Sequence, residues 1–205
     1  MPHRTIGSCA ALLIGAGASL THAHHVMDYA LPATALEGLL SGFGHPVIGI
    51  DHLIFIVGAG VLASRVSRGY LLALIFVVAS IAAAGWRAAG ASLELDELWI
   101  AATLIIVGAI LLAGRNPGRA ECAALFAVCG ALHGYALAEA IVGAERTPLL
   151  AYFAGLTLIQ CAIALAAWWA ATWFTAHRPQ LAFPRWVGGA VGAAGLVFAG
   201  MATLG

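Results

Sequence analysis

The sequence predicts an all-α membrane protein in which six transmembrane helices follow a cleavable signal peptide. The first observation is composition: 62% of the 205 residues are hydrophobic, only 9% are charged, and the mean hydropathy is +0.98. Nine acidic and nine basic residues cannot cover the surface of a soluble domain of this length. The second is that apolar segments near the ~20 residues of a spanning helix recur along the chain. Because backbone groups in lipid must be satisfied within their own segment, these segments are predicted to be helices.

Residues 1–23 have the form of a secretory signal peptide. A short basic start precedes an apolar stretch from Ile6 to Leu20 and a small-residue cleavage site that ends at Ala23. About 15 apolar residues are short for a membrane span, so cleavage is favoured over an uncleaved first helix. The mature chain then begins outside the cytoplasm with His24 and His25.

The remaining chain divides into two predicted parts. Residues 24–45 are expected to be an extracytoplasmic segment with a short interfacial or re-entrant helix, because Glu37 and several Gly and Pro residues interrupt 32–44. Residues 46–205 are the predicted six-helix transmembrane domain. Its helices are expected at 46–64, 69–85, 98–113, 120–142, 149–174 and 187–204.

The arginines predict how these helices are oriented. All nine basic residues are Arg, and cytoplasmic loops are generally enriched in Lys and Arg. With the mature N-terminus outside, the outer loops hold only Arg87 and Arg146. The cytoplasmic loops then hold Arg65, Arg68, Arg115, Arg119, Arg178 and Arg185. The expected location is therefore the bacterial inner (cytoplasmic) membrane, as a multi-pass protein.

The same composition bounds the partners. The lipid bilayer is the expected surrounding, and a formal net charge of zero gives no reason to expect nucleic acid. A homo-oligomer is compatible with the sequence. The four cysteines lack the spacing of a disulfide framework or a CxxC site and are expected to be small buried hydrophobes. Tyr152 and the tryptophans mostly flank predicted helices, which indicates anchors at the membrane interface.

Ionisable residues at the head of the first predicted helix are the most informative feature of the chain. Segment 44–52 holds His45, Asp51 and His52, and such groups inside a membrane are costly and commonly functional. Pro46 suits the opening turn of a helix. His45 and His52 are seven residues apart, which returns to nearly the same helix face. Asp51 and His52 are then expected about 10 Å deeper than His45.

A second polar set lies in the predicted helix 120–142. This helix runs outward, so Glu139 is expected near its outer end and His133 about 9 Å deeper. The two sets therefore match in depth, with His45 and Glu139 at an outer level and Asp51, His52 and His133 at an inner one. The azimuths match less well, because six residues turn Glu139 about 120° away from His133 on an ideal helix.

These side chains predict a path for a divalent transition-metal ion. Imidazole combined with carboxylate suits nickel, cobalt and zinc, whereas magnesium and calcium prefer oxygen ligands. The principal predicted ligands are His45, Asp51, His52, His133 and Glu139. Gln160 fits either the inner level or a role in hydrogen bonding between helices, and His24 and His25 can chelate copper or nickel at the mature terminus. The ion is cargo, and no prosthetic group is expected.

The first polar set resembles a known signature. The segment from His45 to His52 is similar to the HX5DH motif of the HupE/UreJ family of nickel and cobalt permeases, and His133, Gly134 and Ala136 resemble the start of that family's second motif. In many members this second motif continues with a His and a Gly, where this chain has Leu137 and Ala138 and brings Glu139 one residue earlier. The stretch 141–145 with Thr147-Pro148 resembles a sub-branch and adds Glu145 to the secondary candidates.

The resemblance implies a secondary permease that takes up nickel or cobalt and is not an enzyme. Three alternatives stay open from the residues alone. An intramembrane zinc-dependent hydrolase uses His and Asp to bind zinc and activate water, a proton-conducting protein uses chains of His, Asp and Glu, and a haem-binding carrier uses His pairs from two helices. A GxxxxGK[ST] motif is absent from the sequence, which argues against self-contained ATP-driven transport.

Overall fold

The computed structural model describes residues 31–93 and 97–204. This part of the chain contains helices and no strand. Two short 3₁₀ helices, η2 (Ala138–Ile141) and η3 (Pro179–Leu181), extend α6 and precede α8. The signal peptide predicted at 1–23 lies outside the described residues. The α-helices are α2 (Ala35–Ile48), α3 (Ile50–Ala63), α4 (Tyr70–Ala88), α5 (Glu97–Leu112), α6 (Arg119–Leu137), α7 (Arg146–His177) and α8 (Phe183–Leu204).

The prediction of an all-helical membrane architecture is confirmed. Four helices of the described chain are long and apolar enough to cross a membrane: α4, α6 with η2, α7, and α8 with η3. A fifth span results if α2 and α3 are taken together, while α5 is apolar but has only 16 residues. With η2 counted as the end of α6, the ends of α4 to α8 lie within four residues of the predicted bounds. Six full spans therefore stay a prediction.

The first predicted helix, 46–64, is wrong as a continuous element. The chain bends by 77° between α2 and α3, and Gly49 at the break has a non-helical ψ of 89°. Pro46 lies in the last turn of α2 and not at the start of a span. A Cβ on Gly49 would lie 2.9 Å from Cδ2 of His52 and 3.2 Å from the carbonyl oxygen of His45. A side chain at this position would therefore crowd His52 and the end of α2.

Helix α2 starts with a capping box and then packs along α7. Thr34 Oγ1 accepts a hydrogen bond from the Glu37 amide at 3.2 Å, and the Glu37 carboxylate accepts from the amides of Ala33 and Thr34 at 2.7 and 3.2 Å. A Cβ on Gly42 would lie 2.2 Å from the Tyr152 carbonyl oxygen. The two helix backbones are thus in direct contact, and α2 is held against the bundle.

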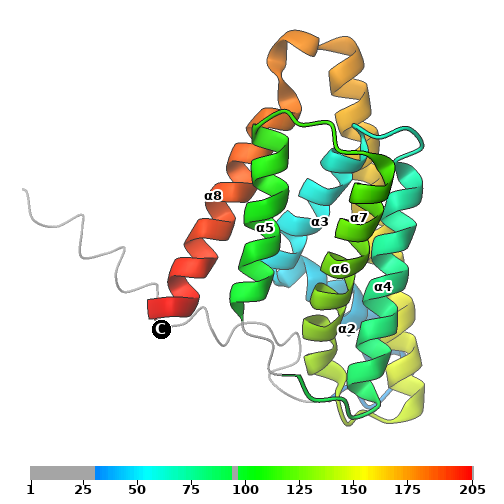
Figure 1. Cartoon of the computed structure of the whole chain (residues 1–205). Helices are drawn as coiled ribbons and strands as arrows, with labels where there is room; N and C mark the ends of the chain where they lie inside the picture. The colour runs from blue at the N-terminus through cyan, green and yellow to red at the C-terminus, as the bar shows by residue number, and fades with distance from the viewer. Residues whose placement is uncertain (1–30, 94–96, 205) are drawn as a thin grey trace, which may run out of the picture.

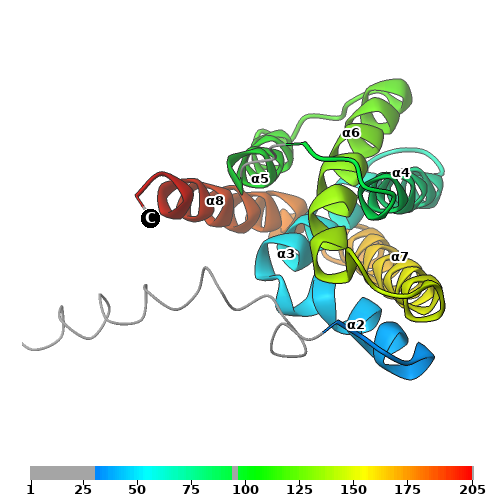
Figure 2. The ribbon, with the colours of Figure 1, turned by 90° about the horizontal axis from the view of Figure 1, so that it is seen from below.

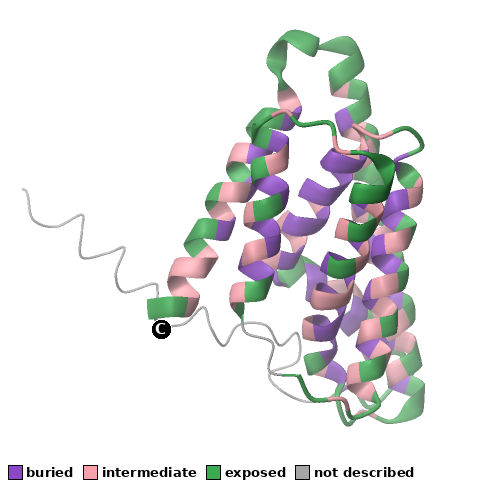
Figure 3. Ribbon diagram, in the orientation of Figure 1, coloured by how far each residue is buried: buried purple, intermediate pink, exposed green. Residues whose placement is uncertain are grey.

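Helix α3 occupies the centre of the bundle. It contacts α2, α4, α5, α6, α7 and α8, and Figure 2, which looks along the bundle, shows it between α8, α6, α7 and α2. Phe55, Ile56 and Leu62 of α3 are buried in the main hydrophobic core, and buried positions concentrate on α3 and on the helix faces turned toward it (Figure 3). The helix that follows the break is therefore the most deeply buried part of the bundle.

Glycines bring neighbouring helix pairs into backbone contact. On α6, a Cβ on Gly134 would lie 2.0 Å from the Ser80 carbonyl oxygen of α4. On α5, a Cβ on Gly108 would lie 2.4 Å from the Gly192 amide nitrogen of α8. Membrane helices gain little hydrophobic drive from associating with one another, so close van der Waals contact at small residues holds them together.

The arginines gather at one end of the bundle. The α3–α4, α5–α6 and α7–α8 connections lie together at that end (Figure 1). Arg65 Nε donates to Asn116 Oδ1 at 3.0 Å, and its guanidinium also donates to the Gly114 carbonyl oxygen at 3.3 Å. The Arg185 guanidinium lies against Gly114 as well. Arg87 lies at the opposite end, where it donates to the Tyr135 hydroxyl at 2.8 Å.

Replacing Gly108 by Ala is expected to destabilise the protein. The new Cβ meets the backbone of α8, which no side-chain rotation relieves, and overpacking of this kind costs roughly 1–3 kcal/mol. Thermal unfolding in detergent should show a lower midpoint for Gly108→Ala. The matched control is Gly85→Ala on α4, where a Cβ meets nothing within 4 Å and the midpoint should stay or rise. Equal midpoints for the two variants would contradict the close contact.

Candidate functional site

A pair of histidines forms the centre of the candidate site. His52 on the first turn of α3 and His133 on α6 approach with their Nδ1 atoms 2.7 Å apart, and the ring centroids are 4.9 Å apart at an interplanar angle of 73°. Both rings are buried, His133 completely. The break at Gly49 and the close packing of Gly134 on α4 allow this approach, because they set the positions of α3 and α6.

The remaining surroundings of His133 are one hydroxyl and two aromatic rings. Thr103 Oγ1 on α5 lies 2.9 Å from His133 Nε2 and also donates to the Ile100 carbonyl oxygen at 2.6 Å. The Phe55 ring stacks on the imidazole with centroids 4.1 Å apart, and the Phe76 centroid lies at 6.3 Å. Both ring nitrogens of His133 therefore have a polar neighbour inside an otherwise apolar enclosure.

His45 belongs to a second polar group on the other side of the break. It is buried in the last turn of α2, and its Nδ1 lies 3.3 Å from the hydroxyl of Tyr152 on α7. The same hydroxyl donates to the carbonyl oxygen of Leu137, the last residue of α6, at 2.5 Å. Because of the 77° bend, the expectation that His45 and His52 share one face of one helix is wrong.

Asp51 supplies a carboxylate beside His52. It is half-buried, in the first turn of α3. Its Oδ1 atom is buried and lacks a hydrogen-bond partner among the residues that the structure describes. The N-terminal end of a helix stabilises a carboxylate through its dipole. A buried carboxylate oxygen in this position is suited to accept a cation or a proton donor.

Gln160 contributes a second buried oxygen. It is fully buried on α7, and its Nε2 donates to Ser80 Oγ on α4 at 3.1 Å. The hydrogen bond joins two helices, which is one of the two roles predicted for it. Its Oε1 is also buried without a hydrogen-bond partner in the described part of the chain. Ser80 also packs against Gly134 of α6, the neighbour of His133 in sequence, so the hydrogen bond joins α7 to the contact between α4 and α6.

The two predicted glutamates lie apart from these groups. Glu139 is exposed on η2, where α6 tightens into a 3₁₀ turn, and Glu145 is exposed at the start of α7. Within residues 31–93 and 97–204, no three His, Cys, Asp or Glu side chains are grouped closely enough to hold a metal ion. The candidates His24 and His25 lie outside the described residues.

Tyr152 and Thr103 are site residues that sequence reasoning missed. Tyr152 was expected at the membrane interface because it lies near the end of a predicted helix, but it is fully buried under α2. Thr103 carried no signal beyond a polar residue in an apolar segment. A search for hydroxyl residues within one turn of the predicted histidine level would have found Thr103, although it would not have paired it with His133.

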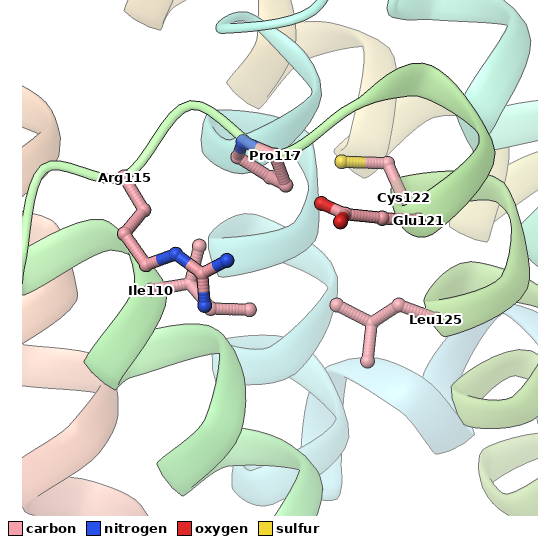
Figure 4. A pocket seen from close by; sticks show the side chains of 6 residues that line it. All are labelled: Ile110, Arg115, Pro117, Glu121, Cys122 and Leu125. Atoms are coloured by element: carbon pink, nitrogen blue, oxygen red, sulfur yellow. The ribbon is translucent and has the colours of Figure 1, made fainter.

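A cavity lies away from the histidines, at the arginine-rich end. It has a volume of about 280 Å³ and separates α5 from α6; Ile110, Arg115, Pro117, Glu121, Cys122 and Leu125 line it. Figure 4 shows the Arg115 side chain on one side of the hollow and Glu121 and Cys122 on the other. Glu121 also accepts a hydrogen bond from the Gly118 amide at 3.0 Å, which caps α6.

Comparison with known proteins identifies the family. The sequence profile described as HupE / UreJ protein matches residues 11–198, which is most of the chain. The chain belongs to the HupE/UreJ family. Comparison with curated proteins and with solved structures gives no match. The resemblance seen in the first motif is thereby confirmed. HupE/UreJ proteins are linked to nickel and cobalt uptake, and the apolar helices of this member make it a multi-pass membrane protein.

In this HupE/UreJ protein the hydrogen bond between Thr103 and His133 should be measurable. Thr103→Val keeps the volume but leaves a buried ring nitrogen of His133 without its partner, which costs roughly 1–3 kcal/mol. In a His133→Leu background the same substitution should cost clearly less. The two singles and the double variant, compared by denaturation in detergent, give the coupling energy. A coupling within error of zero would contradict the contact.

Proposed function

We propose that this HupE/UreJ protein is a secondary permease that takes up a divalent transition-metal ion, with nickel or cobalt as cargo and zinc or copper as competing ions. The observation that carries the proposal is the contact between His52 and His133 at 2.7 Å in the interior of the bundle. Buried histidines between membrane helices are costly unless they serve a pathway or a bound ion. Membership of a family linked to nickel and cobalt uptake supports a metal ion as the cargo.

The chemistry of the buried side chains supports a borderline divalent ion. Imidazole nitrogens are offered by His45 and His52, and Asp51 adds a carboxylate oxygen that is buried and lacks a hydrogen-bond partner among the described residues. Such mixed nitrogen and oxygen sites select nickel, cobalt or zinc over magnesium and calcium. Mixed ligands also keep binding weak enough for the ion to leave, which conduction requires.

The proposed route runs from the outer end of the bundle inward. Exposed Glu139 and Glu145, with His24 and His25 at the mature terminus, are proposed to collect the ion. His45 and the Asp51–His52 pair then receive it beside His133, and the buried amide oxygen of Gln160 follows. Release occurs toward the arginine-rich end. The outer carboxylates attract cations electrostatically, which raises the local ion concentration at the mouth.

Two of the alternatives are separable from this proposal. A haem between His52 and His133 is disfavoured, because their Nδ1 atoms are in direct contact at 2.7 Å and leave no space for a macrocycle. A zinc-dependent hydrolase requires zinc that stays bound with an activated water. Stoichiometric zinc that survives chelation of the purified protein would favour that enzyme, whereas exchangeable metal favours the permease. Proton conduction without metal dependence is an outcome of the same transport assay.

Metal uptake in cells tests the proposal. His52→Ala should lower nickel or cobalt accumulation by at least about tenfold, the smaller end of what disturbed metal sites usually lose. The matched control is His177→Ala at the exposed end of α7, which should transport like the wild type. Expression must be equal for the three proteins. Wild-type uptake by His52→Ala would exclude the proposed path. Binding of nickel, cobalt, zinc and copper to the purified proteins then ranks the cargo.

We propose the bacterial inner membrane as the location, with both described ends of the chain outside the cytoplasm. Six arginines at the α3–α4, α5–α6 and α7–α8 end and two at the other support this orientation. A fusion of alkaline phosphatase after residue 205 should be active, and a green fluorescent protein in the same place should be dark. A fluorescent green fluorescent protein fusion together with an inactive phosphatase fusion would contradict the proposed orientation.

A further inference from the structure

The hydroxyl of Tyr152 determines which nitrogen of His45 carries a proton. A phenol has one proton, and the carbonyl oxygen of Leu137 at 2.5 Å can only accept it. The contact between the hydroxyl and His45 Nδ1 at 3.3 Å is then a hydrogen bond only if Nδ1 supplies the proton. His45 therefore carries N–H at Nδ1 and, as a neutral ring, a lone pair at Nε2.

The hydroxyl of Thr103 determines the tautomer of His133, and His133 in turn determines that of His52. The Thr103 hydroxyl donates its one proton to the Ile100 carbonyl oxygen at 2.6 Å, so it accepts from His133 Nε2 at 2.9 Å. A neutral His133 then has its lone pair at Nδ1. The His52 Nδ1 atom, 2.7 Å away, must provide the proton between the two rings. His52 likewise keeps its lone pair at Nε2.

The two histidines of the first motif thus share one tautomer through unrelated partners. We propose that Tyr152 and the Thr103–His133 pair are positioning residues, which hold His45 and His52 as Nδ1–H tautomers so that each offers Nε2 to the metal ion. This inference rests on the proposed metal path. It gives His133 a supporting role: its Nδ1 accepts a hydrogen bond from His52 and does not bind the ion.

The physical benefit is a fixed and more basic ligand. Which nitrogen of a histidine binds metal is set by the hydrogen bond that the other nitrogen makes. Such supporting partners orient the ring and are commonly worth 10–100-fold in metal affinity. The Phe55 ring stacks on His133 with centroids 4.1 Å apart and restricts rotation of the His133 ring. Thr103 and Tyr152 are buried, so water does not compete for these hydrogen bonds.

Imidazole nitrogen NMR tests the inference directly in the wild type. With ¹⁵N-histidine in the full-length protein in lipid discs, the His45 and His52 signals, assigned by His45→Gln and His52→Gln, should show Nδ1 protonated and Nε2 unprotonated. On addition of Zn²⁺ as a diamagnetic probe, Nε2 should shift while Nδ1 keeps its proton. Protonated Nε2 in either metal-free ring, or loss of the Nδ1 protons on Zn²⁺ binding, overturns the inference.

Two hydroxyl deletions test the effect on affinity. Tyr152→Phe should return His45 to a mixture of tautomers, and Thr103→Val should do the same for His52; each should raise the Kd for nickel about 10–100-fold. Thr103→Ser keeps the hydroxyl, so it should keep both the Nδ1–H tautomer of His52 and the wild-type Kd for nickel. Tyr70→Phe, at the arginine-rich end, and Thr157→Val, whose hydroxyl bonds its own helix at 2.7 Å, are the matched controls. Unchanged Kd values in both deletions overturn the inference.

Failure of the inference and failure of the proposed function give different results. A wild type that takes up nickel but carries the proton on Nε2 keeps the permease and removes the positioning role. A wild type with both Nδ1–H tautomers that neither binds nor transports any of the four metals removes the permease, and the hydrogen-bond assignment alone survives.

Discussion

The interior of this bundle depends on one physical constraint: a buried polar group is costly unless it has a hydrogen-bond partner. His133 is fully buried and meets it with His52 on one nitrogen and Thr103 on the other. These three residues come from α3, α5 and α6, so one small hydrogen-bonded group ties three helices that otherwise share apolar contacts. Unpaired polar atoms in an apolar interior cost several kcal/mol in the least favourable case, so these hydrogen bonds favour the arrangement in which α3, α5 and α6 meet.

The break at Gly49 is what allows two separate polar groups to form. A continuous helix would direct His45 and His52 to one face, whereas the 77° bend gives them different neighbours on α7 and α6. The bend also places the carbonyl end of α2 beside the amide end of α3. Helix ends carry opposite partial charges, so this junction can accommodate a cation and a carboxylate at adjacent positions, as discontinuous helices do in transporters.

Much of this architecture was predictable because composition and segment length respond directly to the membrane. The bounds of α4 to α8 and the grouping of arginines at one end follow from hydropathy and charge alone. The sequence also put His52 and His133 at one level, and the structure has them in contact. The break was missed because Pro46 was interpreted as the first-turn proline of a span, whereas it lies inside α2, where it removes an i→i−4 hydrogen bond just before the bend. Tyr152 was misplaced because only the packing of α2 on α7 buries it, and no local pattern encodes that contact.

Helix α7 has a consequence for how the protein can be studied. Its 32 residues give a length of about 48 Å, against a hydrocarbon layer of about 30 Å. The 19 residues of the neighbouring α4 match the layer instead. The far end of α7 and the start of α8 accordingly stand above the other helices as a hairpin (Figure 1). For a protein of 20.9 kDa, otherwise enclosed by lipid or detergent, this exposed hairpin is an epitope against which an antibody fragment can be raised as a fiducial for electron microscopy.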